Sequence, residues 1–149
     1  QAPSTKVDRI RSLGAQVSLV GDSFEDCLWW AKSKARSGGF RFLHAFDDPD
    51  VIAGQGTVAL EILEKRPKVV LIPMGGGGLA AGASVVLKEA GVEVVGVQVE
   101  GVDALASYLR GGPARIRPRP TVADGLRVEA PTIKMQTVLP QVVVPQAEQ

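Results

Sequence analysis

Short apolar runs alternate along this chain with longer stretches whose apolar side chains recur at helical spacing. The short runs predict strands, which we expect at residues 17–20, 41–45, 69–72 and 94–99, with a weaker one at 142–144. The longer stretches predict helices, which we expect at residues 5–12, 24–36, 49–64, 79–90 and 102–109. Strands that alternate with helices are typical of right-handed crossovers and parallel pairing. The pattern therefore predicts the α/β class, with three layers and helices flanking a mainly parallel sheet.

Four consecutive glycines separate the predicted strand at 69–72 from the helix that follows; they are Gly75, Gly76, Gly77 and Gly78. Glycine loses more backbone entropy on folding than any other residue, so such a run indicates unusual torsions or a ligand that touches bare backbone. Successive exposed N–H groups form a nest for anions, and the following helix directs its positive end into it. We therefore expect a phosphate site here, at the carboxyl end of a strand. A glycine-rich turn without a ligand is the alternative.

Other phosphate-binding motifs fit these glycines less well. A P-loop is disfavoured because Ala83-Ser84 stand where that motif needs lysine followed by serine or threonine. A dinucleotide fingerprint fits loosely through Gly76, Gly78 and Ala81, and Glu100 stands at about the distance expected for a ribose-binding acid. An NAD-binding domain therefore stays open as an alternative.

The predicted helix at 49–64 has a clear start and an unusual interior. Asp48 supplies a capping carboxylate, and Pro49 occupies a first-turn position where its missing N–H has no cost. Gly54 and Gly56 inside the helix each cost about 1 kcal/mol relative to alanine, so we expect a close backbone approach, with tight helix packing as the simplest cause. His44, just before this segment, is expected to be a hydrogen-bonded strand-end residue with no catalytic role.

Three segments resemble the threonine dehydratase and serine racemase family. They are the stretches HAFDDPDVIAGQGTVALE at 44–61, PMGGGGLAAG at 73–82 and TVADG at 121–125. The resemblance extends from residue 1 to about residue 128 and implies the fold type II of pyridoxal-phosphate enzymes, which is similar to the β subunit of tryptophan synthase.

The resemblance implies where this chain would hold pyridoxal 5′-phosphate. The backbone N–H groups of the glycine run and of the next residue would bind the cofactor phosphate; these residues are Gly75, Gly76, Gly77, Gly78 and Leu79. The backbone around Gly125 would lie beside the cofactor ring.

The resemblance also implies a domain division and a reaction. Residues 1–45 would be a remnant of the small domain, and residues 46–149 would be part of the large, cofactor-phosphate-binding domain. The implied activity is that of a threonine or serine dehydratase, an ammonia-lyase of amino-acid metabolism that converts a β-hydroxy amino acid to a 2-oxo acid and ammonia. The cofactor ring would serve as the electron sink. Threonine or serine would be the small-molecule substrate, and the complete enzyme would be a homo-oligomer.

The residue that carries the chemistry in this family has no counterpart here. The family holds its cofactor on a Schiff-base lysine near the N-terminus, in a Ser-x-Lys-x-Arg-Gly-like context that is absent from this sequence. All lysines of the chain lie in charged or amphipathic settings typical of a solvated surface; they are Lys6, Lys32, Lys34, Lys65, Lys68, Lys88 and Lys134. We therefore expect a fragment that resembles the middle of a longer, complete enzyme, contains no catalytic residue and is inactive alone.

Two departures from the family pattern bear on the type of reaction. Racemase-like members carry acidic metal ligands where this chain has Gln98 and Ala104, so we expect no metal site. They usually carry asparagine where this chain has Phe46, which favours a dehydratase. A serine racemase-like enzyme remains an alternative, as does a non-catalytic binding module that retains the glycine run.

Composition limits the partners and the compartment that we expect. A formal net charge of +1 provides no electrostatic footprint for nucleic acid or an anionic membrane surface. No apolar run is long enough to span a bilayer. The single Cys27 forms no internal disulfide, which fits a reducing cytoplasm, and we expect it to be a buried apolar residue of its helix.

Overall fold

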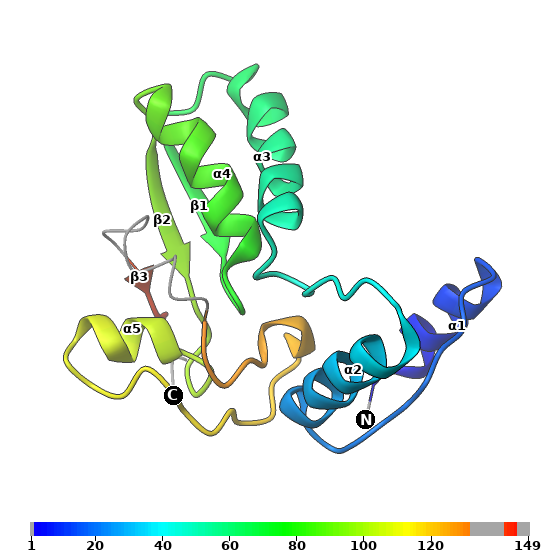
Figure 1. The fold of residues 1–149 in the computed structure, drawn as a ribbon. Helices are drawn as coiled ribbons and strands as arrows, with labels where there is room; N and C mark the ends of the chain where they lie inside the picture. Colours follow the sequence, from blue (N-terminus) through cyan, green and yellow to red (C-terminus); the bar gives the residue numbers. More distant parts are fainter. Residues whose placement is uncertain (1, 132–141, 146–149) are drawn as a thin grey trace. The chain divides into compact units, whose positions relative to one another are not determined.

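The computed structural model describes residues 2–131 and 142–145 and divides into two compact units (Figure 1). The units are Gln1–Leu43 and His44–Gln149. The assignment of residues 1–45 to a small domain and of residues 46–149 to a large domain stays a prediction.

The first unit contains two helices. α1 spans Ser4–Ser12 and α2 spans Phe24–Gly38, which confirms the helices expected there. α2 begins with a capping box, in which the Ser23 side chain accepts a hydrogen bond from the Asp26 N–H and the Asp26 carboxylate accepts one from the Ser23 N–H. Hydrogen bonding to the Ser23 side chain, followed by the bonds from the backbone N–H groups, lowers the pKa of Asp26.

The strands predicted at residues 17–20 and 41–45 are wrong. In the described part of the chain, neither segment belongs to a strand. An extended segment becomes a strand only when a neighbouring strand pairs with its N–H and C=O groups, and an apolar pattern does not reveal that neighbour. The burial expected for Cys27 is also wrong, because α2 buries none of its residues and Cys27 is exposed.

The second unit contains a parallel sheet with flanking helices. Its elements are α3 (Pro49–Leu63), β1 (Val69–Pro73), α4 (Gly78–Glu89), β2 (Glu93–Val97), α5 (Ala104–Leu109), the 3-10 turn η1 (Asp124–Leu126) and β3 (Val142–Val143). The strand order is β1-β2-β3, and both pairs are parallel, with Val69 opposite Glu93 and Gly96 opposite Val142. This arrangement confirms the α/β class, the parallel sheet and the remaining predicted elements, apart from small shifts at their ends.

Helix α4 covers one face of β1 and β2, and α3 packs beside α4 (Figure 1). Ile72 and Val94 bring the two strands into a core that includes Ala80 and Leu87 of α4. Val69 and Leu71 alternate with the core side chains of β1 and are 48% and 66% exposed. The second helix layer expected for a three-layer fold is therefore not seen over β1 among the described residues.

Two glycines bring α3 and α4 into close contact. A Cβ atom at Gly82 of α4 would collide with the carbonyl oxygen of Ile52 and would lie 2.8 Å from the backbone nitrogen of Gly56 in α3. The close backbone approach expected at Gly56 is thus confirmed as helix packing. Gly54 is different, because it is exposed and a Cβ there would meet nothing within 4 Å.

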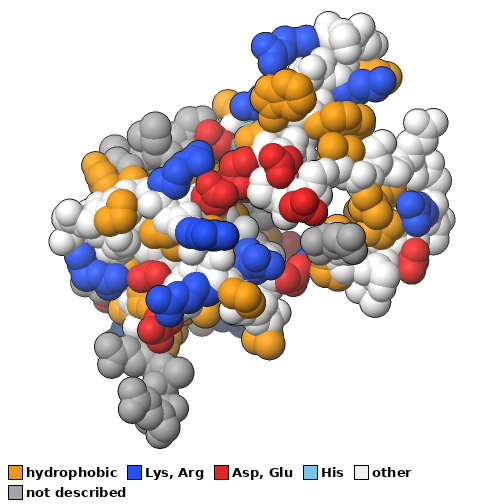
Figure 2. Space-filling model, turned by 90° about the horizontal axis from the view of Figure 1, so that it is seen from below, with side chains coloured by type: hydrophobic (Ala, Val, Ile, Leu, Met, Phe, Trp, Pro, Cys, Tyr) orange, Lys and Arg blue, Asp and Glu red, His pale blue; other side chains and the backbone are white. Residues whose placement is uncertain are grey.

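The surface mixes charged and apolar side chains. Figure 2 shows basic and acidic side chains lying among hydrophobic ones on one face. Several large apolar side chains are exposed; those of the first unit are Ile10, Leu13, Leu19, Trp29, Phe40 and Leu43. Among the described residues, no helix combines the length and the apolar character needed to cross a membrane.

Candidate cofactor-phosphate site

The glycine loop, defined here as Gly75 to Gly78, begins where β1 ends. The N–H of Met74, just after β1, donates a 2.9 Å hydrogen bond to the carbonyl of Val97 at the end of β2. The loop then leads directly into α4, whose N-cap is Gly77. It therefore lies at the carboxyl edge of the parallel sheet, where open α/β sheets bind ligands.

Three of the four glycines are required for two different physical reasons. Gly77 has a φ of 98°, in the left-handed region that side chains rarely adopt. A Cβ at Gly76 would lie 2.5 Å from carbon atoms of the Phe46 ring, and one at Gly78 would lie 2.5 Å from the Phe46 carbonyl oxygen. Unusual torsion therefore explains Gly77, whereas the close approach of Phe46 explains Gly76 and Gly78.

The remaining glycine lies against a segment from much later in the chain. A Cβ at Gly75 would lie 2.9 Å from the Cα atom of Leu126 and 3.0 Å from the carbonyl oxygen of Gly125. The glycine loop is thus enclosed by Phe46 on one side and by η1 on another. All three segments that carry the family resemblance meet at this loop.

The loop offers a set of backbone donors. In the described part of the chain, no residue accepts a hydrogen bond from the N–H of Gly75, Gly76 or Gly77. The first-turn N–H groups of α4, on Gly78 and Leu79, have no intrahelical acceptor either, and the first bond of the helix is the 2.8 Å bond from the Ala81 N–H to the Gly77 carbonyl. Because Gly76, Gly77 and Gly78 are buried, leaving such donors without an acceptor costs about 1–3 kcal/mol each. An anion bound here would satisfy them and would meet the positive end of α4.

His44 shapes the approach of Phe46 to the loop. Its Nδ1 accepts hydrogen bonds from the backbone N–H groups of Phe46 and Asp47, at 3.3 Å and 3.0 Å. An Nδ1 that accepts hydrogen bonds places the imidazole proton on Nε2. The ring of His44 also meets that of Phe46 edge to face, with centroids 4.6 Å apart. The hydrogen-bonded structural role expected for His44 is present, although in a loop and not at the end of a strand.

Helix α3 begins just after this loop, as the sequence predicts. Asp48 Oδ1 accepts hydrogen bonds from the N–H groups of Asp50 and Val51, at 2.9 Å and 3.4 Å, and Pro49 is the first helical residue. The segment that carries Phe46 is therefore fixed by hydrogen bonds to the His44 side chain and by the capped helix that follows it.

Sequence reasoning missed two residues that enclose the loop. Phe46 was identified only as a departure from the racemase pattern, and Leu126 lies just beyond the third motif. Apolar patterns do not reveal which side chain fills the space above a glycine, so no signal in a single sequence marks these contacts. Gly125 is exposed, and a Cβ there would meet nothing within 4 Å, so crowding by neighbouring atoms does not require glycine at this position.

Gln98 and Glu100, which follow β2, occupy different environments. Gln98 is 1% exposed, and its Oε1 accepts a 2.9 Å hydrogen bond from the Ala106 N–H in the first turn of α5. Its oxygen is therefore used to fix α5. Glu100 is exposed beyond the end of β2. Within residues 2–131 and 142–145, no group of three potential metal-ligating side chains occurs.

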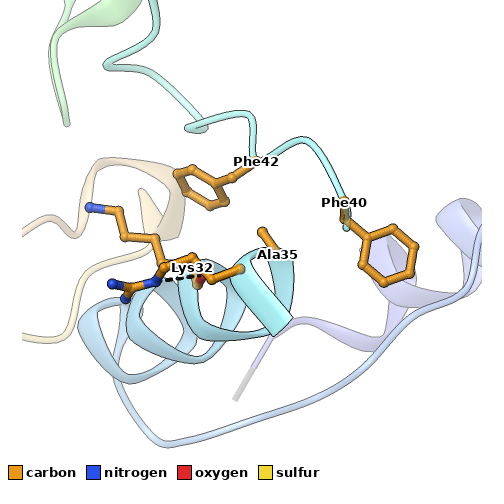
Figure 3. A pocket seen from close by; sticks show the side chains of 5 residues that line it. Lys32, Ala35, Phe40 and Phe42 are labelled. Atoms are coloured by element: carbon orange, nitrogen blue, oxygen red, sulfur yellow. Dashed lines mark hydrogen bonds between the residues drawn. The ribbon is translucent and has the colours of Figure 1, made fainter. Parts of the chain in front are cut away.

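A separate hollow of about 380 Å³ lies in the first unit, lined by Lys32, Ala35, Arg36, Phe40 and Phe42 (Figure 3). The Lys32 Nζ lies 5.8 Å from the centroid of the Phe42 ring, and the Arg36 Nε donates a 3.4 Å hydrogen bond to the Lys32 carbonyl. Phe40 is 66% exposed, so the hollow is shallow and does not enclose a small molecule. It contains none of the site residues expected from the sequence.

Comparison with known proteins shows which protein family the chain resembles. The chain matches the family model described as pyridoxal-phosphate dependent enzyme over residues 1–143. It is 45% identical over 135 residues to the L-threonine ammonia-lyase of Thermotoga maritima, a match that covers 87% of this chain and 34% of that protein. It is 40% identical over 135 residues to the catabolic L-threonine dehydratase of Escherichia coli, covering 87% of this chain and 41% of that protein.

Solved structures give the same result for the fold. The processed form of threonine deaminase isoform 2 from Solanum lycopersicum superposes with a TM-score of 0.82 at 32% identity, covering 96% of this chain and 44% of that one. Maize serine racemase superposes with a TM-score of 0.83 at 25% identity, covering 95% of this chain and 47% of that one. These neighbours confirm the fold type II expectation. The chain spans less than half the length of these relatives.

Proposed function

This chain belongs to the family of pyridoxal-phosphate dependent enzymes, and from that premise we propose that its glycine loop binds the cofactor phosphate in an ammonia-lyase that acts on threonine or serine. The observation that carries the proposal is the set of loop N–H groups that have no acceptor in the described chain. The relatives support the reaction class, since those from Thermotoga maritima and Escherichia coli are named as an L-threonine ammonia-lyase and an L-threonine dehydratase.

The residues at the loop fit a phosphate group. The N–H groups of the loop have no acceptor in the described chain, and the α4 N-terminus adds the partial positive charge of its aligned peptide dipoles. When bound, pyridoxal phosphate supplies an electron sink for the carbanion formed on an amino-acid substrate. The proposed ligands of its phosphate are the N–H groups of Gly75, Gly76, Gly77, Gly78 and Leu79.

The proposed role of this chain is to bind and orient the cofactor. Backbone donors that the fold already holds in place need no reorganisation when the anion arrives, which favours tight binding. The backbone around Gly125, which lies against Gly75, is proposed to lie beside the ring. No residue of this chain is proposed to transfer a proton, because its lysines fit no family motif for holding the cofactor.

The remaining assignments follow from the same premise. We assign residues 1–45 to a small domain and 46–149 to a large domain, and we expect a cytoplasmic homo-oligomer that has no nucleic-acid or membrane partner. A racemase-like enzyme is less well supported. Its metal ligands would require carboxylates at Gln98 and Ala104, and the side-chain oxygen of Gln98 already caps α5.

The direct test is an assay of the complete protein in which this chain occurs. With added pyridoxal phosphate and threonine, we expect 2-oxobutanoate and ammonia; with serine, we expect pyruvate. Turnover of neither amino acid, with the cofactor bound, would support a non-catalytic binding module. Micromolar binding of NAD in a calorimetric titration would instead support the dinucleotide alternative, in which Glu100 contacts a ribose.

A further inference from the structure

Phe46 and the glycine loop form a contact between segments about thirty residues apart in the sequence. The ring of Phe46 lies over Gly76, where a Cβ would come within 2.5 Å of its atoms. The backbone of the same residue lies against Gly78, where a Cβ would be 2.5 Å from the Phe46 carbonyl oxygen and 3.0 Å from its Cα atom. One residue therefore limits the positions of two of the four glycines.

The segment that carries Phe46 is itself fixed at both ends. The Nδ1 atom of His44 accepts hydrogen bonds from the N–H groups of Phe46 and Asp47, and the capped helix α3 begins at Pro49. Helix α3 is in turn locked to α4 through Gly56, where a Cβ would lie 3.2 Å from the Gly82 carbonyl oxygen. Because α4 begins at the loop, these contacts close a ring that runs from α3 through Phe46 and the loop into α4.

Four glycines in succession need such a support. Each can adopt torsions that other residues cannot, so an unsupported loop would populate many conformations and its N–H groups would seldom point the same way. If the loop became ordered only when the anion binds, the entropic cost of ordering it would weaken the binding. A side chain that fixes the loop beforehand removes that cost.

On the premise that the loop binds the cofactor phosphate, we propose that Phe46, supported by His44, is a positioning residue that holds the glycine loop in its anion-binding conformation. Phe46 has no catalytic role in this proposal. Its ring restricts the loop by occupying the space above Gly76, and the hydrogen bonds to His44 fix its backbone.

The test uses the complete protein and four variants: Phe46→Ala, Phe46→Leu, Gly76→Ala and the double variant Phe46→Ala/Gly76→Ala. For each, we would measure the dissociation constants of pyridoxal phosphate, of pyridoxal without the phosphate and of inorganic phosphate. Hydrogen exchange of the loop amides in the cofactor-free protein would report on the order of the loop. Val94→Ala, in the core at β2, is the control for a general loss of stability.

We expect Phe46→Ala to weaken binding of pyridoxal phosphate and inorganic phosphate by about tenfold or more. A disordered loop would lose hydrogen bonds to the phosphate, and the loss of even one charge-assisted hydrogen bond lowers the affinity by about that factor. Pyridoxal affinity should change little, and the loop amides should exchange faster. Gly76→Ala should also weaken phosphate binding, because its methyl group would strike the ring. The double variant should bind phosphate more tightly than Gly76→Ala alone, because removing the ring makes room for that methyl group. Val94→Ala should lower stability without changing the phosphate affinity.

Two outcomes contradict the proposal in distinguishable ways. If the wild-type protein binds pyridoxal phosphate and both folded Phe46 variants bind it equally well with unchanged loop exchange, Phe46 does not position the loop, although the cofactor assignment stands. If the wild-type protein does not bind the cofactor at all, the proposed function fails, and this inference fails with it. Phe46→Leu keeps the test decisive if Phe46→Ala does not fold.

Discussion

A Cβ atom at Gly56 would lie 3.2 Å from the carbonyl oxygen of Gly82, so the backbones of α3 and α4 touch at these two glycines. Helices approach this closely only where side chains are absent from the contact. Because α3 follows Phe46 and α4 follows the glycine loop, this crossing sets the distance between two of the segments that form the candidate site. The two glycines thus have a structural role that also determines the geometry of the site.

The first prediction concerns this helix crossing. Gly82→Ala should destabilise the protein by about 1–3 kcal/mol, because its methyl group would collide with the Ile52 carbonyl oxygen and force the helices apart. Propensity alone predicts the opposite, since alanine is favoured in a helix interior. Gly54→Ala is the matched control in α3. Gly54 is exposed with open space around it, so the alanine should raise the free energy of unfolding by about 0.5–1 kcal/mol. Urea unfolding midpoints of the two variants measure the difference, and equal midpoints would contradict the close crossing.

The second prediction concerns the side chain that caps α5. Gln98→Ala should cost about 1–3 kcal/mol, because the buried N–H of Ala106 would lose its acceptor. Gln16→Ala, at an exposed position, should change the free energy of unfolding by less than about 0.5 kcal/mol. Denaturant unfolding of both variants provides the comparison. A Gln98→Ala protein as stable as the wild type would show that the hydrogen bond is dispensable.

The third prediction concerns the pH dependence of helix α2. Its hydrogen bonds lower the pKa of Asp26 below the ordinary value of 3.8. A carboxylate whose pKa is lowered in the folded state stabilises that state above the ordinary value, and this stabilisation is lost as the pH falls through the lowered pKa. The helix content of the first unit should therefore decrease in that acidic range. Asp26→Asn cannot titrate, so the acid-induced loss of helix content that Asp26 causes should be missing from a circular dichroism titration of this variant. The same titration curve for the variant and the wild type would argue against the capping box.

The sequence predicted the α/β class, most elements of the second unit and the place of the glycine loop. These features depend on local patterns, such as the apolar run before the four glycines and the Asp48-Pro49 start of α3. The two strands predicted at 17–20 and 41–45 were wrong, because strand formation depends on a paired neighbour that a local pattern does not contain.

Sequence patterns could not predict the contacts that shape the site, for a related reason. The sequence indicated that a run of glycines was needed, but it did not separate the torsional need at Gly77 from the spatial need at Gly76. That distinction depends on Phe46, about thirty residues earlier, and the contact at Gly75 depends on Leu126, about fifty residues later. Long-range packing of this kind is visible only in the folded chain.

Whether the glycine loop holds the phosphate of pyridoxal phosphate is measured by the cofactor affinity of a Gly76→Asp variant of the complete protein. Aspartate there would add a side chain where Phe46 leaves no room and a negative charge beside the phosphate. Losing even two charge-assisted hydrogen bonds predicts a fall in affinity of roughly a hundredfold or more. Gly54→Ala should bind the cofactor as the wild type does. Unchanged affinity for pyridoxal phosphate in a well-folded Gly76→Asp protein would show that the glycine loop does not hold the cofactor phosphate.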